Sequence, residues 1–529
     1  MIDRHKVGRR AGADSVSWAA RSGTLVAAAL WGLALTVASA PARADWAEVS
    51  SDHFVIYGEQ RPEALRKFAE RLEMFHAAMC LSFKRDAPKP SPSNRVTVYV
   101  VSNTREVREL ADSNNRFLGG LYMARAGQSV ALVPRLSDTK SRVGDTTETT
   151  LFHEYAHHFM RTMTAHTHPL WFNEGFAEFF SSARFTDDQI GIGTPAQHRA
   201  YDLAYARDVP IRDLLDYDGG ASAKDSRYDS FYGQAWALFH YLVFAPERAG
   251  QLPRYERLLA EGQSALQAAE LAFGDLKQLD KDLEQYVQRR LLRYLPIKKK
   301  DLHVGTITVR VLPPAQAAMM PVKVRSRSGV SPAEAADVVL EARRVAAAHP
   351  NDAYVLTALA EAEVDAERYD EAIAAADRAL TLEPNLVDAH IQKGYALERK
   401  LQSGAATPEA WRTIRSQWVK ANKVEPDNPI PLIGFYGSFL RQGAPPTANA
   451  IQGLERALSV APFDGSTRWM VAQQRLADGR LAAAAEALGP LAYSPHPGEH
   501  TDAARQLLEN VQAKLASPES GADQVGQTE

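Results

Sequence analysis

The period of the hydrophobic positions changes twice along the chain. Between 45 and 135, apolar runs typical of strands, such as 95–101, alternate with an amphipathic helical pattern at 61–83. From 136 to 297 the helical period dominates, and from 329 to 516 alanine-rich helical segments follow one another. We therefore expect an α/β N-terminal part, a helical part that completes the same domain, and an all-α region.

Individual elements can be assigned from the same pattern. Further strands are predicted at 46–57, 118–122 and 129–133, and helices at 169–182, 195–207, 228–245, 253–272 and 278–294. Residues 298–328 are predicted to be a linker with two short strands, one in HVGTITVRVL (303–312) and one in VKVRS (322–326).

The alanine-rich region carries an internal repeat. Prolines that follow predicted helices stand at 350, 384, 426, 462 and 495, at spacings of 34, 42, 36 and 33 residues. A period near 34 predicts tetratricopeptide repeats, and an irregular helical bundle is the alternative. Small residues fall where such repeats need close helix packing: Ala360, Ala372, Ala379, Gly394, Ala421, Ala450 and Ala457. Stacked repeats form concave surfaces, so we expect a protein partner there.

The composition of the chain limits which partners and which metal ligands are possible. The chain has 529 residues, a formal net charge of -3 and one cysteine, Cys80. The charge gives no reason to expect nucleic acid as a partner, and the basic run at 289–300 is interpreted as a solvated linker. A single cysteine excludes an intrachain disulfide and a four-cysteine zinc site, so any metal must bind nitrogen and oxygen ligands.

The N-terminus predicts export. Basic residues precede an apolar run from Leu25 to Val37, and Ala42-Arg43-Ala44 fits the small-x-small rule for signal-peptide cleavage. Residues 1–44 are thus a predicted signal peptide, with an uncleaved anchor at 23–40 as the alternative. We expect a periplasmic or secreted protein without stable membrane insertion after cleavage. The small, polar tail 517–529 is predicted to be disordered.

Residues 151–180 contain the candidate chemistry. His153 and His157 are four apart, so they share one face of a helix, and Glu154 follows the first histidine. Glu174 and Glu178 share a face of the next predicted helix. Two imidazoles and one carboxylate predict a Zn²⁺ site with an open coordination position. The other carboxylate can accept an imidazole N–H, and the spacing leaves open which glutamate does which.

The two motifs carry a family resemblance. HEYAH (153–157) and WFNEGFAE (171–178) resemble the gluzincin metallopeptidases, and with the repeats the chain resembles exported bacterial proteins of the peptidase-MA-like type. The resemblance implies a zincin-like α+β domain followed by the tetratricopeptide-repeat solenoid. It implies His153, His157 and Glu174 as metal ligands, Glu154 as general base, Glu178 as the acceptor of an N–H from His153, and Asn173 as a residue that fixes the ligand helix. Glu178 as third ligand is the rival assignment.

In this mechanism Zn²⁺ lowers the pKa of its bound water and Glu154 removes a proton from that water. A second electrophile is expected on the helix at 228–245, where Tyr228, Tyr232 and His240 are candidates and Tyr232 is preferred by analogy. His158 is not expected to bind the metal, and His166 and His168 are expected to face solvent. A strand at 118–123 or 129–133 could pair with an extended substrate.

The sequence thus predicts a zinc-dependent peptidase that acts on a peptide or protein substrate. The alternative from another class is a non-catalytic envelope scaffold or binding protein, in which the repeats bind and the zinc site is structural or vestigial. Zinc-dependent hydrolysis of a non-peptide amide or ester is a third possibility.

Overall fold

The structure, a computed structural model, describes residues 45–116, 118–136, 146–164, 167–217, 230–402, 406–494 and 498–516. The contacts discussed below all lie within one folded unit that begins at Ala44. The signal-peptide segment 1–44 and the tail 517–529 lie outside the described residues, so both remain predictions.

A six-stranded mixed sheet underlies the N-terminal region, in the order β4-β5-β3-β2-β1-β9. Its strands are β1 (Ala47–Ser50), β2 (Phe54–Gly58), β3 (Val96–Val101), β4 (Leu121–Met123), β5 (Val130–Pro134) and β9 (Thr308–Val311). Strands β2, β3 and β5 are parallel, and the other pairings are antiparallel. The short strand β4 forms one edge, and β9 forms the other.

Two predictions about this sheet need correction. The single strand expected at 46–57 is an antiparallel pair, because the chain reverses between Ser51 and Phe54, where the Ser51 amide donates to the Phe54 carbonyl. The predicted linker 298–328 is also integrated into the fold, since β9 pairs with β1.

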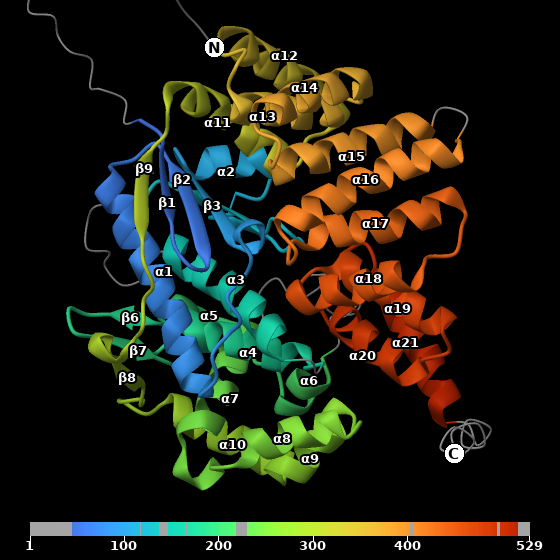
Figure 1. Ribbon diagram of the computed structural model, residues 1–529. Helices are drawn as coiled ribbons and strands as arrows, with labels where there is room; N and C mark the ends of the chain where they lie inside the picture. The colour runs from blue at the N-terminus through green and yellow to red at the C-terminus, as the bar shows by residue number, and fades with distance from the viewer. Residues whose placement is uncertain are drawn as a thin grey trace, which may run out of the picture. The chain divides into compact units, whose positions relative to one another are not determined.

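Alternating side chains of the central strands fill the two faces of the sheet. Val98 and Val100 of β3 belong to the core formed with helix α1 (Pro62–Phe83), whereas Tyr99 and Val101 join a second cluster on the opposite face. Figure 1 shows α1 running alongside β1 and β2. Because both faces are covered, the strand sequence is a continuous apolar run rather than an alternating one.

Helix α11 (Pro314–Ser328) contributes to the second cluster together with α2 (Thr104–Leu110). The strand predicted at 322–326 was therefore wrong. Met320 and Val324 are four residues apart, so a helix turns both toward the sheet, and both are buried there.

The middle of the chain is helical, as predicted. The site helices are α3 (Thr146–Met163), α4 (Leu170–Ser181) and α7 (Phe231–Phe244). Supporting elements are α5 (Ala200–Tyr205), α6 (Ile211–Asp216), α8 (Gln251–Ala260), α9 (Ala265–Phe273), α10 (Leu276–Val287) and a sheet of β6 (Arg184–Phe185), β7 (Gln189–Ile192) and β8 (Leu295–Lys298). The helix expected at 253–272 is split into α8 and α9 at Gly262, whose φ is +88°.

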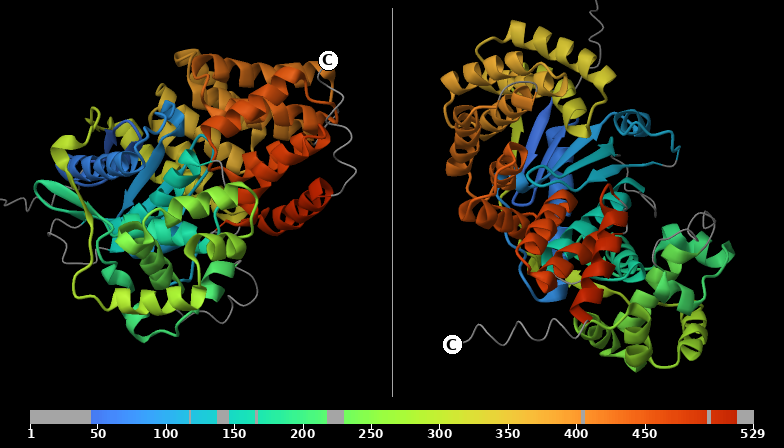
Figure 2. Two further views of the ribbon diagram at one scale, coloured as in Figure 1. Left: turned by 90° about the horizontal axis from the view of Figure 1, so that it is seen from below. Right: turned by 90° about the vertical axis from the view of Figure 1, so that its right-hand side faces the viewer.

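The C-terminal region is an array of antiparallel helix pairs (Figure 2), so the predicted all-helical repeat region is confirmed. Its helices are α12 (Pro332–Ala348), α13 (Ala353–Asp365), α14 (Tyr369–Leu382), α15 (Val387–Gln402), α16 (Pro408–Val424), α17 (Pro429–Gln442), α18 (Ala448–Val460), α19 (Gly465–Ala477), α20 (Leu481–Ala492) and α21 (Thr501–Ala516). From α13 on, the first helices of successive pairs start 34, 42, 36 and 36 residues apart. These separations are typical of tetratricopeptide-like units, an architecture that serves protein binding.

Small residues allow these helices to approach one another. Ala360, Ala372 and Ala379 are fully buried, as are Ala421, Ala450 and Ala457. A Cβ on Gly394 would lie 2.8 Å from the Trp418 ring. Part of the expected loop 402–408 lies outside the described residues.

Hydrogen bonds connect the array to the sheet domain. Glu425 accepts hydrogen bonds from the Ser93 amide and hydroxyl at 2.8 and 2.7 Å, and Asn94 Nδ2 donates to the Val460 carbonyl at 2.7 Å. Asp464 accepts from the Ala126 amide at 3.0 Å. These contacts place segment 425–464 of the array against the loop before β3 and against the turn between β4 and β5. Among the described residues, no helix has both the length and the apolar composition needed to cross a membrane.

Gly175 sits where α4 and α7 approach most closely. A Cβ at this position would lie 2.5 Å from the Ala235 carbonyl oxygen, so Gly175→Ala must push the two helix backbones apart. Overpacking costs about 1–3 kcal/mol, partly offset by about 1 kcal/mol of helix propensity. We predict a lower thermal unfolding midpoint for Gly175→Ala. The control is Gly453→Ala in α18, where the nearest atom would be an ordinary 3.6 Å away, and the midpoint should not fall.

His240 of α7 is fully buried and makes stability depend on pH. Its Nδ1 accepts from the Tyr286 hydroxyl at 2.8 Å, and its Nε2 faces the Gly193 and Arg293 carbonyls, both at 2.9 Å. Burial lowers the His240 pKa to about 4, against the opposing effect of the two carbonyls. The unfolded chain therefore binds the proton first, and stability falls as pH drops from about 6.5 toward 4.

The pH effect can be isolated by comparison with His240→Gln, which does not titrate. The wild type should be the more stable at pH 7, and its advantage should shrink by up to about 3 kcal/mol on acidification to pH 4. Denaturant unfolding at several pH values measures this difference. An advantage that is constant with pH would contradict the assigned pKa shift.

Candidate metal centre

Helices α3 and α4 bring two imidazoles and one carboxylate to a single point. His153 Nε2 lies 3.2 Å from His157 Nε2 and 3.2 Å from Glu174 Oε2, and His157 Nε2 lies 3.6 Å from the same oxygen. Because the histidines are one helical turn apart, their rings project from one face of α3 toward α4. All three donor atoms lie within 4.8 Å of one another.

The donor set fits a zinc ion. Ligand atoms bound at about 2.0–2.1 Å in a tetrahedron are about 3.3 Å apart, close to the three observed separations. Glu174 is 1% exposed, and neither of its oxygens accepts a hydrogen bond from a described residue. A buried carboxylate in such surroundings is costly unless a cation compensates it. Nitrogen and carboxylate oxygen are ligands that zinc accepts.

Glu178 is engaged differently from Glu174. Its Oε1 lies 3.4 Å from His153 Nδ1 and accepts from Arg199 Nε at 2.9 Å, and its Oε2 lies 2.6 Å from His198 Nε2. The carboxylate therefore contacts the ring nitrogen of His153 that faces away from the cluster, as expected for a group that orients a metal-binding histidine. The structure thus brings Glu174, and not Glu178, to the donor cluster.

The charges of the cluster are mutually compensating. Burial disfavours ionised His153, but the carboxylates of Glu174 and Glu178 outweigh this effect and raise its pKa to about 10. Burial likewise opposes ionisation of the glutamates, yet the imidazoles lower the pKa of Glu174, and His153, His198 and Arg199 lower that of Glu178. The two buried carboxylates therefore favour positive charge at the imidazoles beside them.

Residues at the helix ends hold this arrangement. Asn173 Nδ2 donates to the His168 carbonyl at 2.9 Å, which ties the start of α4 to the preceding loop. His168 is 6% exposed and stacks on Phe172 with centroids 4.5 Å apart, so the expectation that it faces solvent was wrong. His166 lies outside the described residues. His158 is directed elsewhere, with Nδ1 2.7 Å from the Tyr122 hydroxyl.

The three candidates for a second electrophile have different positions. Tyr232, at the start of α7, is 40% exposed, and the Arg199 guanidinium lies 4.7 Å from its ring centroid. The charge of Glu174, followed by burial, raises the pKa of Tyr232, so the phenol stays protonated. His240 is bonded to core groups and does not face the cluster. Tyr228 lies outside the described residues.

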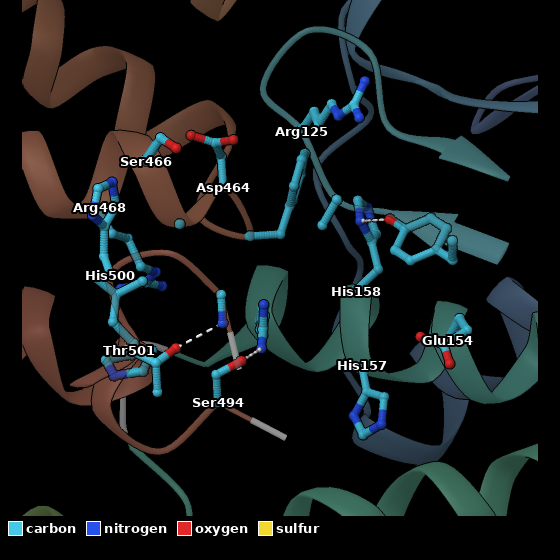
Figure 3. Close-up of a pocket in the computed structure, with 18 of the residues that line it drawn as sticks. Arg125, Glu154, His157, His158, Asp464, Ser466, Arg468, Ser494, His500 and Thr501 are labelled. Carbon is cyan, nitrogen blue, oxygen red and sulfur yellow. Dashed lines mark hydrogen bonds between the residues drawn. The ribbon is translucent and has the colours of Figure 1, made fainter. Parts of the chain in front are cut away.

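A cavity of about 600 Å³ opens beside the cluster. Figure 3 shows Glu154, His157 and His158 of α3 on one side and Asp464, Ser466, Arg468 and His500 of the repeat array on the other. Tyr122 of the edge strand β4 also lines it. Sequence reasoning missed that the array borders this cavity and that His198 and Arg199 bind Glu178, because no motif links these distant segments.

The chain matches no known family model and no curated protein sequence. Among solved structures it is similar to the tetratricopeptide-repeat protein TTC0263 of Thermus thermophilus, with 16% identity over 38% of this chain and 99% of that chain and a TM-score of 0.29. It is also similar to MamA of Desulfovibrio magneticus, with 15% identity, 38% and 97% coverage and a TM-score of 0.26. Its own helix pairs define its C-terminal region as an array of tetratricopeptide-like repeats.

Proposed function

We propose that the chain is an exported zinc-dependent peptidase. A zincin-like domain, 45–297 extended by β9, binds Zn²⁺ through His153, His157 and Glu174. The observation that carries the proposal is the convergence of these three donors around a buried carboxylate that has no hydrogen-bond donor among the described residues. The predicted signal peptide supports a periplasmic or secreted location.

When bound, Zn²⁺ supplies a Lewis acid that lowers the pKa of water toward about 7 and polarises a carbonyl oxygen. Glu154 is the general base, because it follows His153 on α3 and lines the cavity. Its carboxylate takes the proton of the attacking water and returns it to the leaving nitrogen. Tyr232 stays protonated and donates its O–H to the oxyanion of the substrate carbonyl. Glu178 and Asn173 hold His153 and α4 in position.

The substrate is proposed to be an extended peptide. Strand β4 is the edge of the six-stranded sheet, and Leu121 and Tyr122 of this strand line the cavity that contains Glu154. An edge strand offers backbone groups with which a peptide can pair as an added strand. A peptide bound in this way lies within reach of α3.

A second candidate function is a non-catalytic envelope scaffold or binding protein. The helix-pair array supports it, because such arrays bind proteins along their surface without chemistry. In that case the metal would be structural or vestigial, and Glu154 would have no catalytic duty.

Metal content and turnover separate the two candidates. We expect about one zinc per chain in the purified mature protein, and none after His153→Ala removes a ligand. Glu154→Gln should keep the zinc and lose peptide hydrolysis by about 10²-fold or more, because it removes the general base. Elemental analysis and cleavage of a broad peptide library measure both.

The matched control is His158→Gln, which alters the next histidine on the same helix and should retain the metal. Wild-type protein without zinc would contradict the proposal. Zinc without cleavage of any peptide would favour the scaffold.

Glu174 and Glu178 can be distinguished by metal affinity. Glu178→Gln keeps the shape but weakens the contact with His153, so zinc affinity should fall about 10- to 100-fold. Glu174→Gln removes a charged ligand and should lower affinity further. Competition with a chromophoric chelator at fixed pH measures both values. A larger loss for Glu178→Gln would reverse the assignment.

A further inference from the structure

Two arginines from distant parts of the chain meet at the cavity. Arg161 is near the end of α3, Arg468 is in α19 of the repeat array, and both line the large cavity beside Glu154. Both also border a second, much smaller cavity, which confirms that they are neighbours. Arg468 is 6% exposed.

Among the residues that the structure describes, no carboxylate contacts either guanidinium. Arg161 Nη2 donates to the Ser494 hydroxyl at 2.8 Å, and Arg468 Nε donates to the Pro462 carbonyl at 2.6 Å. Within the described residues, neither forms an ion pair. These neutral acceptors orient the two groups and leave most of their five N–H donors for another partner.

The other charged groups of the cavity do not compensate the pair. Asp464 is occupied by the Thr467 amide and hydroxyl and by the Ala126 amide. Arg125, a further cation, donates to the Arg327 carbonyl. Glu499 is exposed, and Glu154 lies at the catalytic end.

The electrostatics are those of a site built for an anion. Burial, and then the positive charge of Arg161, lower the pKa of Arg468 to about 10. Burial also lowers the pKa of Arg161, although Tyr122, Glu154 and Glu174 act in the opposite direction. A buried guanidinium beside a partly buried one is unfavourable, and a bound carboxylate relieves the repulsion because arginine binds carboxylates in a bidentate fork.

The spacing of Arg161 and Glu154 along α3 sets the distance between the arginine pair and the proposed general base. Arg161 follows Glu154 by seven residues, two helical turns, so both project from one face about 10 Å apart along the axis. An extended peptide covers about 3.3–3.6 Å per residue. A carboxylate held by the arginines is therefore about three residues from the bond beside Glu154.

We propose that Arg161 and Arg468 form a carboxylate-binding subsite, so that the repeat array selects substrates with a carboxylate about three residues from the scissile bond. The selection rests on the proposed peptidase function, but binding at the subsite does not require turnover. The carboxylate comes from an acidic side chain or from the C-terminus of the peptide.

Binding to the full-length Glu154→Gln chain tests the subsite without cleavage. The probes are three fluorescent heptapeptide pools of equal length. One is neutral with a free C-terminus, one is amidated with a single glutamate, and one is amidated and neutral. In fluorescence anisotropy, at least one of the two pools that contain a carboxylate should bind about tenfold or more tightly than the neutral amidated pool. The reason is that hydrogen bonds to charged groups are strong. The pool that binds more tightly identifies the source of the carboxylate.

Removal of the guanidinium groups should abolish this preference. In Arg161→Gln/Arg468→Gln, measured in the same background, the three pools should bind equally. Arg161→Gln alone is the second variant, since it leaves the buried Arg468 intact, and it should reduce the preference severalfold. The control is Arg475→Gln on the same helix α19, where the arginine pairs with Glu455 at 2.7 Å and does not line the cavity. This variant should keep the preference.

Two results would overturn the subsite. One is equal binding of all three pools to the parent chain, and the other is a preference that survives in both arginine variants. Both are independent of zinc content and hydrolysis. If the chain binds carboxylates but cleaves no peptide, the subsite is therefore supported and the proposed peptidase function is contradicted.

Discussion

The burial of two carboxylates on one face of α4 is the constraint on which the site depends. Glu178 is fully buried and is matched by His153, His198 and Arg199. Glu174 is just as buried, but among the described residues it meets the two imidazoles of α3, which lie outside hydrogen-bond geometry. One carboxylate is thus satisfied by the protein, and the other requires a positive charge at the cluster. A divalent cation at this point is the basis of the proposed function.

This constraint requires a rigid helix. Every residue from Trp171 to Ser181 is buried, so α4 is covered on all sides and cannot turn its polar face to water. The absence of a side chain at Gly175 lets α7 approach, and the amide of Asn173 secures the loop before α4. The rigidity of the donors is therefore a consequence of the aromatic core around them.

The repeat array lines part of the cavity beside the candidate metal centre. Contacts from Ser93, Asn94 and Ala126 place its C-terminal helices beside α3, and the cavity lies between them. The array was expected to bind a protein partner. Its helices also border the cavity that contains Glu154, so the proposed function assigns them a part in orienting the substrate.

The sequence by itself determined most of the helices, the helical repeats, and the faces that carry His153, His157, Glu174 and Glu178, because side-chain periodicity within a helix is a local property. Only the tertiary structure separated Glu174 from Glu178, since the choice depends on His198 and Arg199, which reach α4 through a loop and not through any regular pattern. The helical state of 322–326, the burial of His168 and the meeting of Arg161 with Arg468 were decided in the same way. Each depends on which surface a segment packs against, and that is set by contacts between residues far apart in the chain.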